Sequence, residues 1–318
     1  MTQNHTALSN SAPVLVIGGL GFMGACLVSR LVSRGVQVDV TTSTKIVTSG
    51  VRHVYGITYD ESGFFSLLSI REYGDIYFLA GNPSPSNSEK DPYFDINTTN
   101  IPLLALLKTA VRCDFKGRLW FASSVAVYGG NNEYILGEDS KCSPLSYYAV
   151  SKLMAEEHLK IHNRLHGLHT GVFRIFSTYG GGLKRQLIYD VYKKIKNNSA
   201  EIFLHGTGNE ARDISYVEDQ ISAMLAIADN LVPNGEVWNI GSGELHTVNE
   251  IIMQMCEIMH VDTRIKYQYP MRTYDGVCWR ADIGKLRALE FKQEFTLASG
   301  LRETINAYDE KEINDDAQ

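Results

Sequence analysis

The sequence predicts an α/β fold: a doubly wound parallel sheet followed by a smaller C-terminal α/β lobe. Two observations predict it. Short apolar runs, which are typical of buried parallel strands, alternate with helix-like stretches through about the first 180 residues. Beyond that point the pattern loosens into many small elements, as expected for a separate lobe. In such a sheet, ligands bind at the carboxyl ends of the strands.

The elements are predicted in chain order from these runs. Strands are predicted at 14–19, 36–40, 75–81, 118–124 and the start of 170–180. Helices are predicted at roughly 22–34, 95–112 and 147–166. The pattern divides the chain into a sheet domain of 12–176 with a returning segment at about 213–240, a lobe of 177–212 and 241–309, and flexible termini of 1–11 and 310–318.

Composition and charge limit the classes of function. A net charge of −6 argues against nucleic acid as the main partner. No apolar run reaches the roughly 18 residues that a membrane span needs. Residues 1–11 also lack the basic and apolar regions of a signal peptide. We therefore expect a protein with no membrane or nucleic-acid partner.

Cysteine and histidine spacing argues against a metal site. The five cysteines are scattered and form no Cys-x-x-Cys pair, which favours a reducing, cytoplasmic location. His158, His162 and His166 recur every four residues on a predicted helix, a spacing that can bind metal. A solvated or subunit-facing helix side explains the same spacing, and we expect no metal.

A glycine loop joins the first predicted strand to the first predicted helix. Gly18, Gly21 and Gly24 in "GGLGFMG" are spaced three apart. Glycines permit the tight turn, and free N–H groups at a helix start attract a pyrophosphate. The position predicts a Rossmann-type dinucleotide site. Its predicted contacts are Gly18, Leu20, Gly21, Phe22, Met23 and Gly24.

The end of the second strand indicates which dinucleotide binds. NAD sites normally carry Asp or Glu there to pair with the ribose hydroxyls. This strand instead ends near Thr42, followed by Ser43 and Lys45, while Asp39 lies too early and alternates into the sheet. Small hydroxyls and a lysine suit a 2′-phosphate. NADP(H) is favoured and NAD(H) stays possible.

The stretch "SYYAVSK" places a tyrosine and a lysine on one helix face. Tyr148 and Lys152 are separated by about 40° around a helix, whereas Tyr147 lies about 140° from Lys152. A nearby ammonium favours the phenolate form of tyrosine, which makes it an acid/base near neutral pH. Tyr148 is therefore the candidate, and Tyr147 has a packing or substrate-side role.

Together and in order, these features resemble the short-chain dehydrogenase/reductase family, in its extended, nucleotide-sugar-modifying branch. The resemblance runs from about 13 to 308. Any single motif is weak, but the ordered set is specific. The motifs are "GGLGFMG", "FASSVAVYG" before "YYAVSK", "FRIFSTYGGG", "HGTGNEARDISYVED", "WNIGSGELHTVNEI" and "MRTYDGVCWRADIGKL".

The resemblance implies roles for individual residues. Tyr148 would be the acid/base, Lys152 would hold the nicotinamide ribose and tune Tyr148, and Ser124 would hydrogen-bond the reacting oxygen. Further implied cofactor contacts are Ala80, Gly81 and Asn97. Implied contacts to a nucleotide-diphosphate sugar are Ser84, Ser123, Ser177, Arg212 and Arg272, with the arginines on the diphosphate. The family also implies a homodimer formed through the helices at 95–112 and 147–166.

Departures from the family patterns reduce the number of reactions that the chain could catalyse. Val125 and Ala126 stand where 4,6-dehydratases carry an acidic pair, and Ala126 replaces the Glu that decarboxylases tend to use. Val125 also disfavours the Cys–His chemistry of GDP-fucose synthases. What remains is hydride transfer at a sugar carbon, most simply C4. This chemistry belongs to a 4-epimerase or to a reductase of a 4-keto sugar.

Three features favour the reductase interpretation. Thr42 replaces the acidic NAD residue, and Ser177 replaces the Asn that 4-epimerases usually carry. The segment "WRADIGKLRALEFKQEF" also resembles 4-keto reductases of CDP-linked sugars. A nucleotide-sugar 4-epimerase is the alternative. A non-catalytic NADP-binding regulator is a distant one, disfavoured by the set of Ser124, Tyr148 and Lys152.

Overall fold

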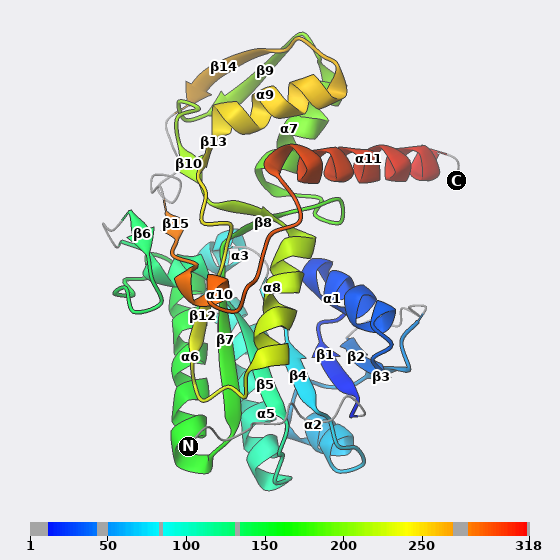
Figure 1. Cartoon of the computed structure of the whole chain (residues 1–318), viewed down its shortest axis with the longest axis vertical. Coiled ribbons are helices and arrows are strands. Elements are labelled where there is room, and N and C mark those ends of the chain that lie inside the picture. Colours follow the sequence, from blue (N-terminus) through cyan, green and yellow to red (C-terminus); the bar gives the residue numbers. More distant parts are fainter. Residues whose placement is uncertain (1–11, 43–49, 83–84, 131–133, 270–278, 317–318) are drawn as a thin grey trace. The chain divides into compact units, whose positions relative to one another are not determined.

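The chain forms two compact units (Figure 1). The computed structural model describes residues 12–42, 50–82, 85–130, 134–269 and 279–316. The first unit, called the sheet unit, comprises Met1–Asn132, Glu138–Ile175 and Ile221–Ile240. The second, called the lobe unit, comprises Glu133–Gly137, Phe176–Gln220 and Gly241–Gln318. Residues 213–220, predicted with the sheet domain, group with the lobe unit.

The sheet unit is built on seven strands in the order β12-β7-β5-β4-β1-β2-β3. Their bounds are β1 (Val14–Ile17), β2 (Val38–Thr42), β3 (His53–Gly56), β4 (Asp75–Phe78), β5 (Arg118–Ser124), β7 (His169–Ile175) and β12 (Val237–Ile240). Every neighbouring pair is parallel. The direction of strand succession reverses between β1 and β4. The predicted doubly wound parallel sheet is confirmed, and this reversal is where such sheets bind ligands.

The described part of the sheet unit also contains helices and short helical turns. They are α1 (Phe22–Ser33), α2 (Glu61–Leu68), α3 (Pro85–Lys90), α4 (Tyr93–Asp95), the π-helical η1 (Ile96–Asn100), α5 (Ile101–Arg112), the 3₁₀ turn η2 (Val125–Tyr128), α6 (Tyr147–His166) and most of α8 (Val217–Asn230). One buried cluster joins α2, α5 and α6 to the central strands, through residues such as Phe64, Leu106, Leu159, Ile17 and Phe121.

Two of the differences between the predicted and observed strands have local physical reasons. The second strand begins at Val38 rather than 36, because Gly35 (φ +76°) and Val36 first close the end of α1. The Val36 amide donates to the Leu31 carbonyl at 3.1 Å. The edge strand β3 was not predicted, since its residues are exposed or half-buried and show no apolar run.

The lobe unit consists of short strand pairs and four helices among its described residues. Its strands are β6 (Ile135–Leu136), β8 (Ser177–Tyr179), β9 (Glu201–His205), β10 (Ala211–Arg212), β11 (Ile214–Tyr216), β13 (His246–Thr247), β14 (Arg264–Tyr269) and β15 (Arg280–Ala281). They pair as β10-β13, β11-β8, β14-β9 and β15-β6. The helices are α7 (Gln186–Asn197), α9 (Val248–Met259), α10 (Gly284–Arg287) and α11 (Leu297–Asp316). Helices α7, α9 and α11 share an apolar core that includes Tyr192, Ile251 and Leu301.

No helix in the described part of the chain combines the length and the apolar character that crossing a membrane would require.

Candidate active site

The loop between β1 and α1 is shaped by glycines. Gly18 has a φ of +85°, and a Cβ there would lie 2.7 Å from the backbone nitrogen of Ala80. A Cβ at Gly24 would collide with the Gly18 carbonyl oxygen. Only glycine fits both positions without distortion. The Gly21 amide donates to the Gly18 carbonyl at 3.0 Å and closes the turn before α1.

The first turn of α1 suits an anion. The helix begins at Phe22 with no side-chain N-cap and with no acidic residue in its first turn. Leu20, Gly21, Phe22 and Met23 lie exposed or half-buried around this end. The positive end of the helix dipole and its backbone amides are the donors that a dinucleotide pyrophosphate needs.

Ala80 and Gly81 follow β4 at the same edge of the sheet. The last residue of β4, Phe78, pairs with Ile17 at the end of β1. Gly81 has a φ of +128° and packs so closely on Thr99 that a side chain would overlap it. The bare backbone after β4 therefore lies beside the glycine loop, where the cofactor wall was predicted.

The last two residues of β2, Thr41 and Thr42, carry hydroxyl groups. β2 ends at Thr42, and the Thr41 hydroxyl lies 2.9 Å from the Tyr59 hydroxyl. Asp39 is fully buried and accepts hydrogen bonds from Arg52 and Arg71 at 3.1 and 3.0 Å, so it is not available to a ribose. The predicted contacts Ser43 and Lys45 lie outside the described residues.

Helix α6 brings Tyr148 and Lys152 together, as the helical spacing predicts. Ser146 caps the helix by accepting from the Ala149 amide at 3.1 Å. The Lys152 ammonium lies 5.7 Å from the centre of the Tyr148 ring and donates to the Ala122 carbonyl of β5 at 2.9 Å. Tyr147 is 56% exposed, and five residues of helix place it about 140° around the axis from Lys152.

The electrostatic setting of Lys152 is unusual for a lysine. Its side chain is buried, and burial lowers the pKa of Lys152 to about 8. The carboxylates of Asp95 and Glu156 act in the opposite direction and raise this pKa. A lysine with a pKa near neutral is typical of residues that take part in proton transfer.

The adjacent serines at the end of β5 have different surroundings. The Ser123 hydroxyl is buried and donates to Glu156 at 2.5 Å. Ser124 is half-buried, and its oxygen accepts from the Ala126 amide at 3.2 Å, which leaves its O–H as a donor for another oxygen. Ser124 therefore suits the predicted catalytic hydroxyl better than Ser123 does.

Glu156 is a residue that the sequence analysis missed. It is fully buried, and its Oε2 accepts from Nη2 of Arg174 on β7 at 2.7 Å. This pair ties α6 to β7, while Ser123 ties the same carboxylate to β5. The signal was present in the sequence, because Tyr148, Lys152 and Glu156 are spaced four residues apart and so share one helix face.

The π-helical segment η1 presents Asn100, not Asn97, to α6. Asn97 is exposed. Asn100 is buried, and its side-chain amide donates to the Ser151 hydroxyl at 2.5 Å. Asn97, the predicted cofactor contact, is thus exposed to solvent. Asn100 instead contacts α6 at Ser151, the residue before Lys152.

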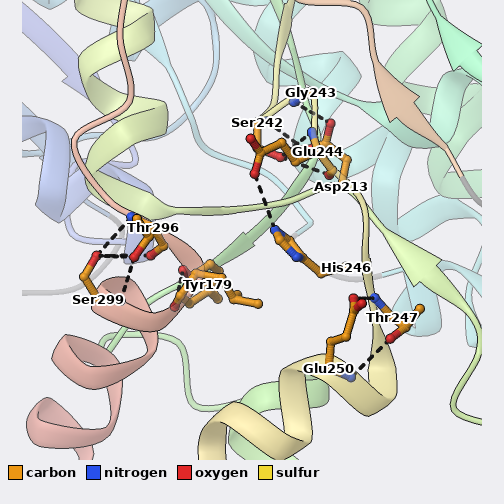
Figure 2. A network of polar contacts seen from close by, with 11 residues as sticks. Tyr179, Asp213, Ser242, Gly243, Glu244, His246, Thr247, Glu250, Thr296 and Ser299 are labelled. Carbon is orange, nitrogen blue, oxygen red and sulfur yellow. Dashed lines mark hydrogen bonds and ion pairs between the residues drawn. The ribbon is translucent and has the colours of Figure 1, made fainter.

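Two of the predicted substrate contacts, Ser177 and Arg212, belong to the lobe unit. Ser177 begins β8 and Arg212 ends β10, and both are half-buried. Asp213, next to Arg212, is buried and accepts from the Ser242 amide and hydroxyl, both at 2.7 Å, and from the Gly243 amide at 2.9 Å (Figure 2). Burial raises the pKa of Asp213. The predicted contacts Ser84 and Arg272 lie outside the described residues.

The three histidines of α6 do not converge on one point. The His162 Nδ1 lies 2.7 Å from the His158 carbonyl, and the rings of His162 and His166 are 5.6 Å apart. Within the described ranges no group of three potential metal ligands is present.

Comparison with known proteins identifies relatives over nearly the whole chain. Residues 14–241 match the model of the NAD dependent epimerase/dehydratase family. The chain is 27% identical over 304 residues to a putative UDP-glucose 4-epimerase of Methanocaldococcus jannaschii, covering 92% of this chain and 97% of that one.

Solved structures agree with this relationship. The UDP-glucose 4-epimerase of Thermotoga maritima with UDP-glucose is similar with a TM-score of 0.85 and 26% identity, over 95% of this chain and 99% of that one. MoeE5 in complex with UDP-glucuronic acid and NAD is similar with a TM-score of 0.83 and 25% identity, over 94% and 99%.

The family match begins at β1 and ends after β12, so it includes the glycine loop, the end of β5 and α6. The resemblance predicted from the motifs is confirmed, and so is the prediction of an enzyme. The chain belongs to the NAD dependent epimerase/dehydratase family.

Proposed function

We propose that this protein is a nucleotide-sugar 4-epimerase that works with a bound nicotinamide dinucleotide. One observation carries the proposal: Tyr148 and Lys152 share a face of α6, which packs against β5 and η2, where Ser124 lies. The residues that follow Ser124 are Val125 and Ala126, which offer no acid or base for elimination of water. The similarity to two proteins named UDP-glucose 4-epimerase, along nearly their whole length, supports the same assignment.

The chain's own groups account for the proton steps. The Tyr148 phenolate accepts the proton of the sugar C4 hydroxyl, and the Lys152 ammonium stabilises the phenolate. The Ser124 hydroxyl donates a hydrogen bond to the C4 oxygen as it becomes a carbonyl. When bound, a nicotinamide dinucleotide would supply reversible hydride transfer at C4. Inversion requires the 4-keto sugar to present its opposite face before it is reduced, and Tyr148 then returns its proton to the C4 oxygen of the epimer.

The residues of the glycine loop would hold the dinucleotide. The amides at the start of α1 would bind the pyrophosphate, and the backbone of Ala80 and Gly81 would line its path. In the lobe unit, Arg212 is a proposed contact to the diphosphate of the substrate, and Ser177 is a proposed contact to the nucleotide sugar. This division follows the predicted roles of the sheet domain and the lobe.

A second candidate is an NADPH-dependent reductase of a 4-keto sugar. The observation that favours it is the end of β2, where Thr42 stands in place of a carboxylate and Asp39 is bound to arginines. Without a carboxylate, the site does not repel a 2′-phosphate. NADP(H) is therefore a proposed alternative to the NAD that the similar MoeE5 carries.

One experiment separates the two candidates. The purified protein is incubated with UDP-, GDP-, CDP- and dTDP-hexoses and their 4-keto forms, with and without NADPH, and the products are separated by chromatography. A 4-epimerase interconverts two C4 epimers while the NADPH absorbance stays constant. A reductase consumes one NADPH for each 4-keto sugar. Absence of both outcomes across the panel would contradict the proposed function.

We also propose a homodimer in the cytoplasm. Exposed apolar side chains gather on α4, η1, α5 and α6, namely Tyr93, Ile96, Ile101, Tyr147 and Val150. Faces of this kind commonly mark protein interfaces. Cys113, Cys142 and Cys256 are free thiols, which fits a reducing compartment.

A further inference from the structure

The carboxylate of Asp95 stands out among the buried acids of the sheet unit. Asp95 is 1% exposed, yet neither of its oxygens has a hydrogen-bond partner among the described residues. By contrast, Asp39, Asp75 and Glu156 each accept several hydrogen bonds. A buried carboxylate without donors is unfavourable unless a positive charge compensates it.

The position of Asp95 links it to the proposed catalytic helix. It ends α4, where the backbone passes into the π-helical turn η1, and such turns are frequent at functional sites. Both α4 and η1 pack against α6. The hydrogen bond from Asn100 to Ser151, at 2.5 Å, fastens η1 to the residue directly before Lys152.

Lys152 is a buried cation whose pKa is raised by the negative charge of Asp95. Lys152 is 6% exposed, and within the described residues its ammonium donates to one partner, the Ala122 carbonyl. The other nearby carboxylate, Glu156, is already paired with Arg174. Asp95 and Lys152 form no ion pair with each other within the described part of the chain, but they lie on α4 and α6, which pack against each other. Among the described residues, neither Asp95 nor Lys152 forms an ion pair.

We propose that Asp95 is the counter-ion that keeps Lys152 in its ammonium form at neutral pH. Asp95 is thus a positioning residue, which acts on Tyr148 through Lys152. The inference rests on the proposed function for its effect on turnover, but the charge state of Lys152 is measurable without substrate. Burial drives Lys152 toward the neutral amine, and the negative charge of Asp95 opposes this.

The other charged groups around Lys152 show what the removal of the Asp95 charge would change. On α6, Lys152 is faced by Tyr148 and Glu156, and from β7 by Arg174, which neutralises Glu156. Two charged residues of α3, which packs on α4 and α6, are Glu89 and Lys90, and both are exposed. Removing the Asp95 charge leaves all of these unchanged. The ammonium of Lys152 then loses its proton at lower pH, and the phenolate of Tyr148 forms at higher pH.

The test is the substitution Asp95→Asn, which keeps the size of the side chain and removes its charge. The Lys152 side chain is titrated by NMR with ¹⁵N-labelled lysine, its signal assigned with a Lys152→Arg variant. We expect the Lys152 transition to fall by about one pH unit relative to the wild type. The pH profile of turnover should narrow, with its acid limb moving up and its alkaline limb moving down. An unshifted Lys152 transition overturns the proposal.

Controls keep this test decisive. Asp91→Asn removes an exposed carboxylate of the same segment, whose oxygen accepts from the Tyr93 amide at 3.0 Å, and should leave the titration unchanged. If Asp95→Asn does not fold, Asp95→Ser takes its place, with the same expected shift. If turnover is absent from the wild type, the proposed function fails, while the NMR titration still decides the role of Asp95.

Discussion

Adjacent serines at the end of β5 show how a single position decides a role. Ser123 points its hydroxyl at the buried Glu156, whereas Ser124 keeps its O–H available. The strand alternation of side chains produces this difference, because neighbouring residues face opposite sides of a sheet. The two serines therefore make a matched pair for separating catalysis from stability.

Replacing Ser124 with Ala should lower turnover by about 100-fold, because the reacting oxygen loses a hydrogen-bond donor. Urea unfolding of this variant should match the wild type. Ser123→Ala should do the reverse and lower the free energy of unfolding by about 1.5–3 kcal/mol, since a bond to a buried charge is lost. Equal kinetic effects of the two variants would argue against the assignment of Ser124.

The twin tyrosines of α6 allow a second test at the same scale. Tyr148→Phe should reduce turnover by about 10²–10⁴-fold, because the acid/base is removed. Tyr147→Phe should retain wild-type turnover, since this ring is exposed and lies about 140° around the helix axis from Lys152. Steady-state kinetics checks both, and cofactor retained on purification shows that the Tyr148→Phe fold is intact. A non-catalytic regulator would keep its output in either variant.

At the scale of elements, α6 carries two of the residues proposed for catalysis, Tyr148 and Lys152. Its buried face carries Tyr148, Lys152 and Glu156 at intervals of four residues. The pair of Glu156 and Arg174 fixes α6 against β7, and the bond from Ser123 fixes it against β5. The helix is therefore held in register with the strand ends where the proposed reaction takes place.

Glu156→Gln should lower the free energy of unfolding by about 3–5 kcal/mol, because it leaves the buried Arg174 charge without its ion-pair partner. Glu157→Gln is the matched control on the next residue. Glu157 is exposed and pairs with Lys160 at 2.7 Å, so its loss should cost less than about 1 kcal/mol. Urea denaturation measures both, and a similar stability of the two variants would contradict the role of Glu156.

Elements differed in how well the sequence predicted them. Strands β1 and β5 were predicted because most of their residues are buried and apolar. The edge strand β3 is partly exposed and left no such pattern. The Tyr148 and Lys152 pair was predicted because helical spacing alone places both on one face. Asp95 was not, because its burial arises only when η1 packs on α6.

At the scale of the molecule, the two units carry different parts of the proposed function. The sheet unit contains the glycine loop and the residues proposed for catalysis. The lobe unit contains the proposed substrate contacts Ser177 and Arg212. Asp213 joins three separate segments of the lobe unit through bonds to Ser242, Gly243 and Ala281. Because the lobe unit is assembled from segments so far apart in sequence, residue patterns alone identified no sugar and no nucleotide base.

The exposed apolar face of α5 and α6 makes a prediction about assembly. Ile101 is 50% exposed on α5 and Val150 is 51% exposed on α6. If this face joins two copies, Ile101→Asp should convert the dimer to a monomer, because a charge would be buried without a partner. Sedimentation velocity measures the change. Ile70→Asp is the control, since Ile70 is 69% exposed beyond the end of α2 and should leave the assembly intact. A wild-type monomer would show that this face serves another purpose.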